Sequence, residues 1–450
     1  MSGDADAARA HSLKWRWEAN LGKDKTAIVV FAPRQAGRGL TGQAAAVTAN
    51  PVVLWGGNPI NVQAAYKHLG LILRSDGKWD DHLADLLRRA TSRVGQLAKF
   101  LLSRTLANDI KRLLVMTCLL PVFEYGSAVW HTSTAQAGLL TTQYLRALRM
   151  ILRCPANTPT EAVLVDLGMP TLEERWDLNK LRLEHRLQQL PAERDPRAVF
   201  DTTWGGRGAH MWSDKVRLLW LQLIPSVAER TQRQAELRGS PGVDFDRAAR
   251  ALVSAREYAG MRRKVRAKKK LGLYAAIEQL EHRGGEGFPR PRAPRLYLRG
   301  CLTPLVQFKF KLRAGVAELR QELERRARGR RGKRPQAACC LDCPGQVESV
   351  SHFVAECHGH DDIRVRLWQG LQGANPACAA TILGLPADQQ TARLLSDVVD
   401  PSVHKDTAAA LRLVVEGFVE RLRGRLKDRL HPVIVDDAVI AALFAESGSE

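Results

Sequence analysis

The sequence has no long apolar run. Its longest, RLLVMTCLLPVF at residues 112–123, is too short to cross a membrane and contains a proline. The opening MSGDADAARAHS lacks the basic and apolar blocks of a secretory signal. We therefore expect an intracellular protein with no membrane association.

Acidic residues are few relative to basic ones. There are 47 Asp and Glu against 68 Lys and Arg, and the net charge is +21 at pH 7. Such an excess favours a polyanionic partner and salt-dependent binding. We expect RNA and/or DNA as the partner, a nuclear location, and no small-molecule substrate.

Signatures of several other protein classes are also missing. No glycine loop is followed by Lys-Ser/Thr, so a P-loop is not predicted, and no fixed-period repeat occurs. Cys118, Cys154, Cys301 and Cys378 are scattered singly, which argues against a disulfide framework and for a reducing compartment. The 450 residues exceed what one hydrophobic core usually serves, so several compact units are predicted.

The other four cysteines gather in CCLDCPGQVESVSHFVAEC, residues 339–357. Cys340, Cys343, His352 and Cys357 have the spacing C-x2-C-x8-H-x4-C. Thiolates and imidazoles at such spacings are the ligands of tetrahedral zinc sites, and four protein ligands leave no open position. The segment predicts a structural Zn²⁺ site that folds a module too small to form its own core.

Alternatives within this segment stay open. Cys339 can replace Cys340, and either His358 or His360 can replace His352. The competing interpretation is chance clustering of buried apolar thiols.

Two blocks of the sequence are strongly basic. MRRKVRAKKK at 261–270 and RRARGRRGKR at 325–334 each have seven basic residues in ten, and the second directly precedes the Cys/His segment. The competing interpretation is a solvated helix face. The candidate nucleic-acid-binding residues in these blocks are Arg262, Arg263, Lys264, Arg266, Lys268, Lys269, Lys270, Arg325, Arg326, Arg328, Arg330, Arg331, Lys333 and Arg334.

The patterning predicts a mainly α fold with a small N-terminal β element (α+β). Extended stretches are predicted at 26–31, 51–55 and 60–73, with a Gly-Gly-Asn-Pro turn at 56–59. A helix is predicted beyond Trp79; its apolar face comprises Leu83, Leu86, Leu87, Ala90, Val94, Leu97, Ala98 and Leu101.

Further helices are predicted along the rest of the chain. One covers 107–120 with Ile110, Leu113, Leu114 and Thr117 facing inward, and others cover 137–152, the stretch before 261, and 411–426. Thr158 and Thr171 each precede a glutamate by three residues, which predicts two helix caps. Residues 195–209 are predicted as loop, and the Gly/Pro/Arg-rich residues 283–295 as a linker.

Six segments, taken in order, carry a family pattern. They are WRWEANLGKDKTAIVVF (15–31), AAYKHLGLIL (64–73), GKWDDH (77–82), LLPVFEYGSAVW (119–130), QYLRALRMILRCPANTP (143–159) and FKLRAGVAEL (310–319), the last followed by the Cys/His cluster. Together they resemble the reverse transcriptases of non-LTR (LINE-like) retrotransposons. In the first segment Asn20 lies two residues too early for the family's N-x-x-K-T stretch.

The resemblance implies a division of the chain. Residues 1–77 correspond to the edge of the palm with a primer-grip-like hairpin, and 78–195 to a helical thumb-like bundle. Residues 196–300 form a basic helical connector and linker, 301–375 a basic segment with a CCHC zinc knuckle, and 376–450 the C-terminal helices.

The resemblance also implies contacts to nucleic acid near the N-terminus. Lys25, or Lys23 in its place, corresponds to a lysine close to the family's polymerising centre, while Tyr66, Lys67 and Gly70 belong to the hairpin. Taken by themselves these lysines are ordinary exposed residues. Large rings such as that of Tyr66 more often pack in a core.

The palm aspartates that hold paired Mg²⁺ in this family have no counterpart before Lys25, where only about two dozen residues stand in this sequence. VDFDRAAR (243–250) and VIVDDAVI (433–440) imitate them but lie out of order; we interpret Asp436 and Asp437 as a turn or helix start. We expect no catalytic residues, and Mg²⁺ only in the intact enzyme.

The predicted function is therefore that of a truncated reverse transcriptase fragment that binds RNA or an RNA/DNA hybrid without extending a primer. Two alternatives stay open. The sequence is an incomplete gene model of an active RNA-directed DNA polymerase, or it is a domesticated zinc-dependent binding or scaffold protein.

Overall fold

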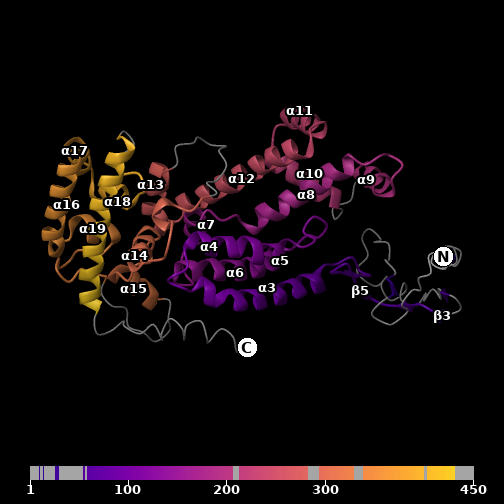
Figure 1. Ribbon diagram of the computed structural model, residues 1–450, viewed down its shortest axis with the longest axis horizontal. Coiled ribbons are helices and arrows are strands. Elements are labelled where there is room, and N and C mark those ends of the chain that lie inside the picture. The colour runs from indigo at the N-terminus through magenta and orange to yellow at the C-terminus, as the bar shows by residue number, and fades with distance from the viewer. Residues whose placement is uncertain are drawn as a thin grey trace. The chain divides into compact units, whose positions relative to one another are not determined.

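The structure of the chain is a computed structural model that describes residues 10, 14, 26–29, 54–55, 58–205, 212–281, 293–328, 338–399 and 403–430 (Figure 1). The chain divides into two compact units. The first comprises residues 1–96, 118–144 and 179–218, and the second comprises residues 97–117, 145–178 and 219–450. The described chain is mainly helical with a few short N-terminal strands, which confirms the predicted fold class.

In the described residues, the β element consists of three short pairs. β1 (Ala27–Ile28) pairs in parallel with β4 (Asn61–Val62), β2 (Leu54–Trp55) pairs antiparallel with β3 (Asn58–Pro59), and β5 (Ala65–His68) pairs antiparallel with β6 (Leu71–Arg74). The extended stretches predicted at 26–31 and 51–55 lie partly outside the described residues.

The β5–β6 hairpin turns through two residues with positive φ, Leu69 at 46° and Gly70 at 81°. Two successive left-handed residues suit the tight turns that join twisted antiparallel strands. A Cβ on Gly70 would lie only 2.8 Å from Cε1 of Tyr125. Glycine is therefore required both for the backbone conformation and for the close approach of this ring.

Helix α3 (Asp80–Leu101) has the predicted apolar face. Leu86, Ala90, Val94 and Leu101 are buried, as are Leu83 and Leu97, while Leu87 and Ala98 are half-buried. A regular 3.6-residue period over several turns makes such a face readable from sequence.

The inward face predicted for residues 107–120 is wrong. The segment consists of α4 (Asn108–Leu114), a π-helical turn η1 (Val115–Leu119) and α5 (Leu120–Glu124). Asn108, Lys111 and Val115 are buried, whereas Ile110 and Leu113 are about half exposed, at 48% and 57%. The Asn108 amide donates to the Leu298 carbonyl at 2.9 Å, so a polar face is the one that turns inward.

The loop predicted at 195–209 is wrong over residues 195–205, which form helix α9 (Asp195–Gly205), while residues 206–209 lie outside the described residues. An acidic residue followed by proline is a good helix start, and Phe200 stacks on Trp204 with ring centroids 5.1 Å apart. The proposed cap at Thr171 is present, since its Oγ1 accepts from the Glu174 amide at 2.9 Å. Thr158 is not a cap, because Pro159 precedes α7 without a side-chain hydrogen bond.

The helices between α5 and α13 have these bounds: α6 (Thr134–Leu152), α7 (Thr160–Asp166), α8 (Leu172–Gln188), α10 (Trp212–Leu223), α11 (Val227–Arg238), α12 (Gly242–Ala267) and α13 (Gly272–Glu281), with the 3₁₀ turn η2 (Lys269–Leu271) before α13. The helices predicted at 137–152 and before 261 are therefore present.

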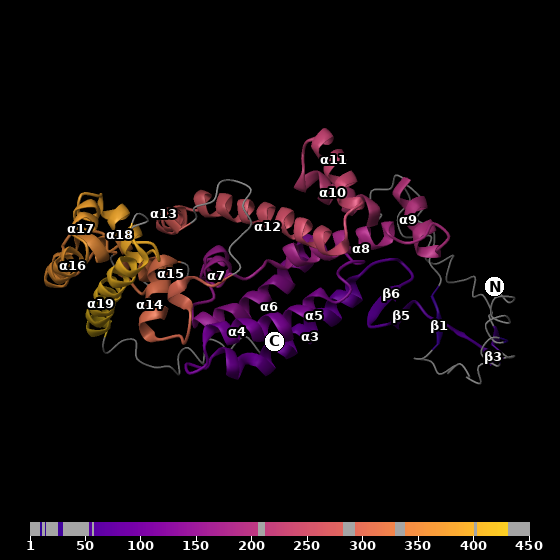
Figure 2. The same ribbon diagram turned by 45° about the horizontal axis from the view of Figure 1, so that its top comes forward.

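The C-terminal part of the second unit has a continuous apolar core. Its elements are η3 (Leu296–Leu298), α14 (Pro304–Arg313), α15 (Arg320–Arg328), η4 (His352–Glu356), η5 (His358–His360), α16 (Asp361–Ala374), α17 (Pro376–Leu383), α18 (Ala387–Leu395) and α19 (Lys405–Leu430). Phe308, Phe353, Leu367 and Phe418 pack in this core. Figures 1 and 2 show α16 to α19 gathered together, and α19 contains the predicted helix at 411–426.

Within the described ranges, no helix combines the length and the apolar character needed to span a membrane.

Candidate metal centre and basic surface

Four side chains from the Cys/His segment meet in the second unit. The ligand atoms of Cys340, Cys343, His352 and Cys357 lie within 4.8 Å of one another, and all four residues are buried. The Cys357 Sγ is 3.5 Å from the Cys340 Sγ and 4.0 Å from the Cys343 Sγ. Tetrahedral thiolates about 2.3 Å from a zinc ion would be about 3.8 Å apart. The cluster therefore has the dimensions of a metal site and can hold a metal ion.

A tight turn places the first two cysteines. The Cys340 amide donates to the Gln346 carbonyl at 2.8 Å, and the Gln346 amide donates to the Cys343 carbonyl at 3.1 Å. Gly345 has a φ of 83°, a left-handed conformation that favours glycine. The His358 amide points at the Cys343 Sγ at 3.3 Å, a contact that stabilises a thiolate.

His352 contributes the one buried imidazole of this cluster. Within the described chain its Nε2 is buried and has no hydrogen-bond partner, while its Nδ1 lies 3.6 Å from a carboxylate oxygen of Glu356. A buried polar atom without a partner is costly, and a metal ion would satisfy it. The carboxylate beside Nδ1 is the kind of group that orients a metal-bound imidazole.

Burial and the neighbouring thiols affect the protonation of Cys357. Burial, together with the neighbouring Cys340 thiol, raises the pKa of Cys357 to about 12. A thiol must lose its proton to bind a metal, so loading of the cluster releases protons and weakens as the pH falls.

The alternative ligands have different surroundings. Cys339 pairs through its backbone with Val347 and is outside the cluster. The His358 side chain is exposed and lies 3.5 Å from Asp361. His360, by contrast, is buried, and its ring lies with Asp342 and Cys357 in a second group of metal-ligand atoms.

The first basic block forms the end of α12 and the turn η2. Arg263, Lys264 and Arg266 are exposed, and so is Lys269. The Arg262 guanidinium lies over the Tyr258 ring at 5.9 Å. The Lys268 ammonium pairs with Glu161 at 2.7 Å, with half of its side chain still exposed.

The described start of the second block lies close to the end of the first, because a Cβ on Gly315 would be 3.4 Å from the Lys270 carbonyl oxygen. Arg325 and Arg326 both pair with Glu322, and Arg326 also donates to the Val316 carbonyl at 2.9 Å. Burial lowers the pKa of Lys270; Glu322 opposes this shift, and the positive charges of Arg325 and Arg326 add to it. Two blocks separated by more than fifty residues therefore share one electrostatic environment.

Several predicted contacts lie outside the described residues: Lys23, Lys25, Arg330, Arg331, Lys333 and Arg334, together with Asp436 and Asp437. Arg328 is the last residue of α15.

In the first unit, the hairpin holds the remaining predicted residues. Tyr66 and Lys67 lie on β5, and Gly70 lies in the turn. The Lys67 ammonium is exposed and 3.8 Å from Asp85. The Tyr125 hydroxyl donates to the Leu69 carbonyl and anchors the turn.

The imitation of a catalytic aspartate at 243–250 has an ordinary structure. Asp244 and Asp246 lie in the first turns of α12 and pair with arginines of the same helix, Arg247 at 3.0 Å and Arg250 at 2.6 Å. These carboxylates serve as helix-start charges.

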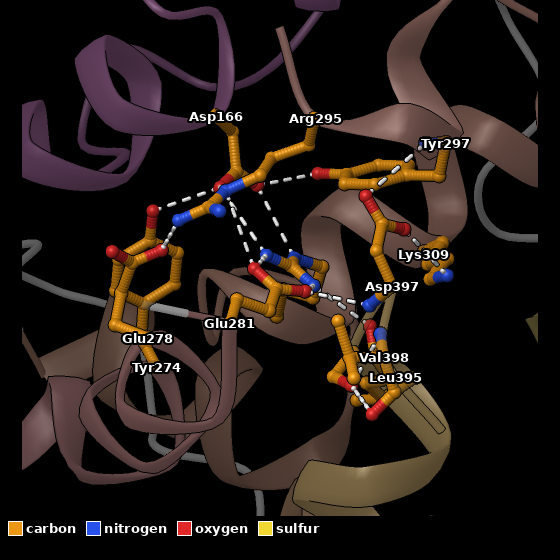
Figure 3. A network of polar contacts seen from close by, with 12 residues as sticks. Asp166, Tyr274, Glu278, Glu281, Arg295, Tyr297, Lys309, Leu395, Asp397 and Val398 are labelled. Carbon is orange, nitrogen blue, oxygen red and sulfur yellow. Dashed lines mark hydrogen bonds and ion pairs between the residues drawn. The ribbon is translucent and has the colours of Figure 1, made fainter. Parts of the chain in front are cut away.

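A buried polar network in the second unit was not predicted (Figure 3). The Arg313 guanidinium is fully buried, with Nη1 2.8 Å from Glu281. The Tyr274 and Tyr297 hydroxyls donate to the Asp166 carboxylate at 2.8 and 2.5 Å. This network fixes α13, which follows the first basic block, against α7 and α14.

Two further basic side chains extend this network. Arg295 pairs with Glu278 and lies 3.2 Å from Glu281, and Lys309 lies 3.5 Å from Asp397. The only sequence signal was Arg313 within FKLRAGVAEL, a segment noted for its family pattern.

The chain matches no protein-family model, no curated protein and no solved structure. The resemblance to non-LTR reverse transcriptases therefore stays a prediction that rests on the sequence motifs.

Proposed function

We propose that this chain binds RNA or an RNA/DNA hybrid through the neighbouring basic blocks of its second unit. The observation that carries the proposal is the closeness of the two blocks. A Cβ on Gly315 would lie 3.4 Å from the Lys270 carbonyl oxygen, and Arg326 donates to the carbonyl of the next residue, Val316, at 2.9 Å. Lysine and arginine side chains held together in this way meet phosphates without reading base sequence.

The packing beneath the first block favours phosphate binding over the alternative of a solvated helix face. The first block is held between the buried core of α12 and the polar network that fixes α13. Arg263, Lys264 and Arg266 are exposed on this rigid base. Preorganised charges lose little entropy when a phosphate binds.

We further propose that the metal ion of the Cys340, Cys343, His352 and Cys357 cluster is Zn²⁺ and that its role is structural. Three thiolates and one imidazole in a buried, four-ligand arrangement suit zinc and leave no open coordination position. The ion would hold together a segment that follows the second basic block.

We infer that the chain corresponds to the thumb side and C-terminal part of a non-LTR reverse transcriptase. A hairpin with Tyr66, Lys67 and Gly70, followed directly by helix α3, supports this assignment. Such a protein works on nucleic acid inside the cell, and a nuclear location suits this role. Mg²⁺ belongs to the intact enzyme.

A primer-extension assay tests the inactive part of this assignment. The purified chain, a template–primer and Mg²⁺ should give no nucleotide incorporation, because these 450 residues hold no ordered pair of palm aspartates. Incorporation by the purified chain would contradict the assignment, and its loss in Asp244→Asn would identify the motif at 243–250 as its source.

The scaffold alternative predicts a different result in a binding assay. A protein that uses its zinc module only for protein contacts should show no steep loss of affinity for labelled RNA between low and moderate salt. Fluorescence anisotropy over a salt series separates the two.

A further inference from the structure

His360 presents a second buried nitrogen without a partner, close to the first cluster. The residue is fully buried, and its Nδ1 is 2.8 Å from the Phe353 carbonyl oxygen. That oxygen can only accept, so Nδ1 carries the proton and Nε2 holds the lone pair. In the part of the chain that the structure describes, Nε2 is buried with no hydrogen-bond partner. Such an orphaned imidazole nitrogen is what a metal ion would satisfy.

Two further donors lie beside this ring. Ligand atoms of Asp342, Cys357 and His360 lie within 4.8 Å of one another, and Cys357 also belongs to the first cluster. A thiolate sulfur has enough lone pairs to bind two metal ions at once. Two adjacent cations can therefore share Cys357.

Gly359 makes the approach of the carboxylate possible. A Cβ on Gly359 would lie 2.3 Å from Oδ2 of Asp342 and 2.6 Å from its Cγ. No side chain can stand so close, so only glycine at this position lets Asp342 reach towards Cys357.

We propose that Asp342, Cys357 and His360 form a second, weaker site for a divalent cation, with the Cys357 thiolate as a bridging ligand. Carboxylate, thiolate and imidazole together suit Zn²⁺, Co²⁺ or Cd²⁺. Because the protein supplies three ligands, the fourth position is open to water, unlike that of the closed first cluster. The inference rests on the proposed metal in the first cluster.

Arg429 of α19 competes for this site. Its guanidinium pairs with the Asp342 carboxylate and lies 3.9 Å from the Cys357 Sγ. It also pairs with Glu348 at 2.8 Å, a residue outside both ligand groups. A cation bound to Asp342 and Cys357 would displace the guanidinium, which can keep its contact with Glu348. The competition makes the second site weaker than the first.

Cadmium titration of the full chain tests the proposal. Bound metal is counted by native mass spectrometry, and ¹¹³Cd NMR detects each bound ion. We expect two bound Cd²⁺ ions at excess metal, with ¹¹³Cd–¹¹³Cd coupling through the shared thiolate. His360→Ala should bind one.

Arg429→Gln is a second test variant, in which every proposed ligand is unchanged. It should bind the second Cd²⁺ about tenfold more tightly, because a competing positive charge is gone. Arg421→Gln, which replaces an exposed arginine of the same helix, is the matched control and should bind it as the wild type does. One bound Cd²⁺ in both the wild type and Arg429→Gln would overturn the second site. No bound Cd²⁺ at all would overturn the proposed first site as well, and neither result bears on RNA binding.

Discussion

The Arg313 guanidinium and the Asp166 carboxylate form an ion pair from which solvent is excluded on both sides, with 3.2 Å between Nε and Oδ2. The two residues are 147 positions apart in the sequence and join α14 to α7. Glu281 shares the same guanidinium, so one arginine compensates two buried carboxylates. The packing around the first basic block depends on this arrangement.

Removal of Arg313 should therefore destabilise the second unit strongly. Arg313→Met leaves Asp166 and Glu281 buried with their main partner gone, and breaking a buried pair in this way costs about 3–5 kcal/mol. Urea unfolding followed by circular dichroism measures the loss. Arg247→Met, an exposed arginine in α12, is the control and should change stability by less than about 0.5 kcal/mol. Equal effects of the two substitutions would contradict the account.

The buried carboxylate of Glu281 should make stability fall in acid. The positive charge and hydrogen bonds of Arg313 outweigh the effect of burial and lower the pKa of Glu281 to about 2. Because this folded-state pKa is below the unfolded value near 4.5, the stabilisation is complete above pH 4.5 and is lost as the pH falls towards 2. In Glu281→Gln this part of the acid dependence should be absent from unfolding curves collected between pH 5 and 2.

Lys111 should have the opposite kind of pH dependence. Its ammonium is buried without a hydrogen-bond partner in the described structure, and burial lowers its pKa from 10.5 to about 8. The unfolded chain then binds more protons between pH 8 and 10.5, so stability should rise with pH in this window, by up to about 3 kcal/mol. Lys111→Met should be more stable at pH 7 and lose the rise. A destabilised Lys111→Met with an unchanged pH profile would show that the ammonium has a partner.

The requirement for glycine in the hairpin turn can be tested in the first unit. Gly70→Ala forces a Cβ into a left-handed conformation and into the Tyr125 ring, so it should destabilise this unit by about 1–3 kcal/mol. Gly95→Ala, where a Cβ meets nothing within 4 Å, is the control and should be neutral or stabilising. Limited proteolysis around residue 70 would report the loosened turn, and equal digestion of both variants would contradict the prediction.

Metal content tests the first cluster. Cys343→Ser should lose the tightly bound Zn²⁺, because it removes one of four ligands. Cys118→Ser, which changes a cysteine outside the cluster, should keep the ion. Elemental analysis after dialysis gives the number of ions per chain. Zinc retained by Cys343→Ser at the wild-type level would remove this residue from the site.

Features with a local pattern could be predicted from the sequence, and features with a long-range or irregular origin could not. The Cys/His spacing places ligands within one turn and one short helical segment, and the α3 period repeats over several turns. The face of residues 107–120 was misread because Asn108 and Lys111 point inward and a π-helical turn changes the register. Arg313 and Asp166 carry no shared local signal, so their pairing depends on the tertiary fold.

The salt dependence of RNA binding tests the central claim most directly. Fluorescence anisotropy with a labelled RNA gives the slope of log K against log salt for the wild type, for Arg263→Gln/Lys264→Gln in the first block, and for Arg233→Gln/Arg247→Gln as a control. If the block contacts phosphates, its double variant should bind RNA more weakly, and its slope should be less negative than that of the wild type by about 1.5. The control should keep the wild-type slope. Identical slopes for all three proteins would contradict the claim that this surface binds nucleic acid.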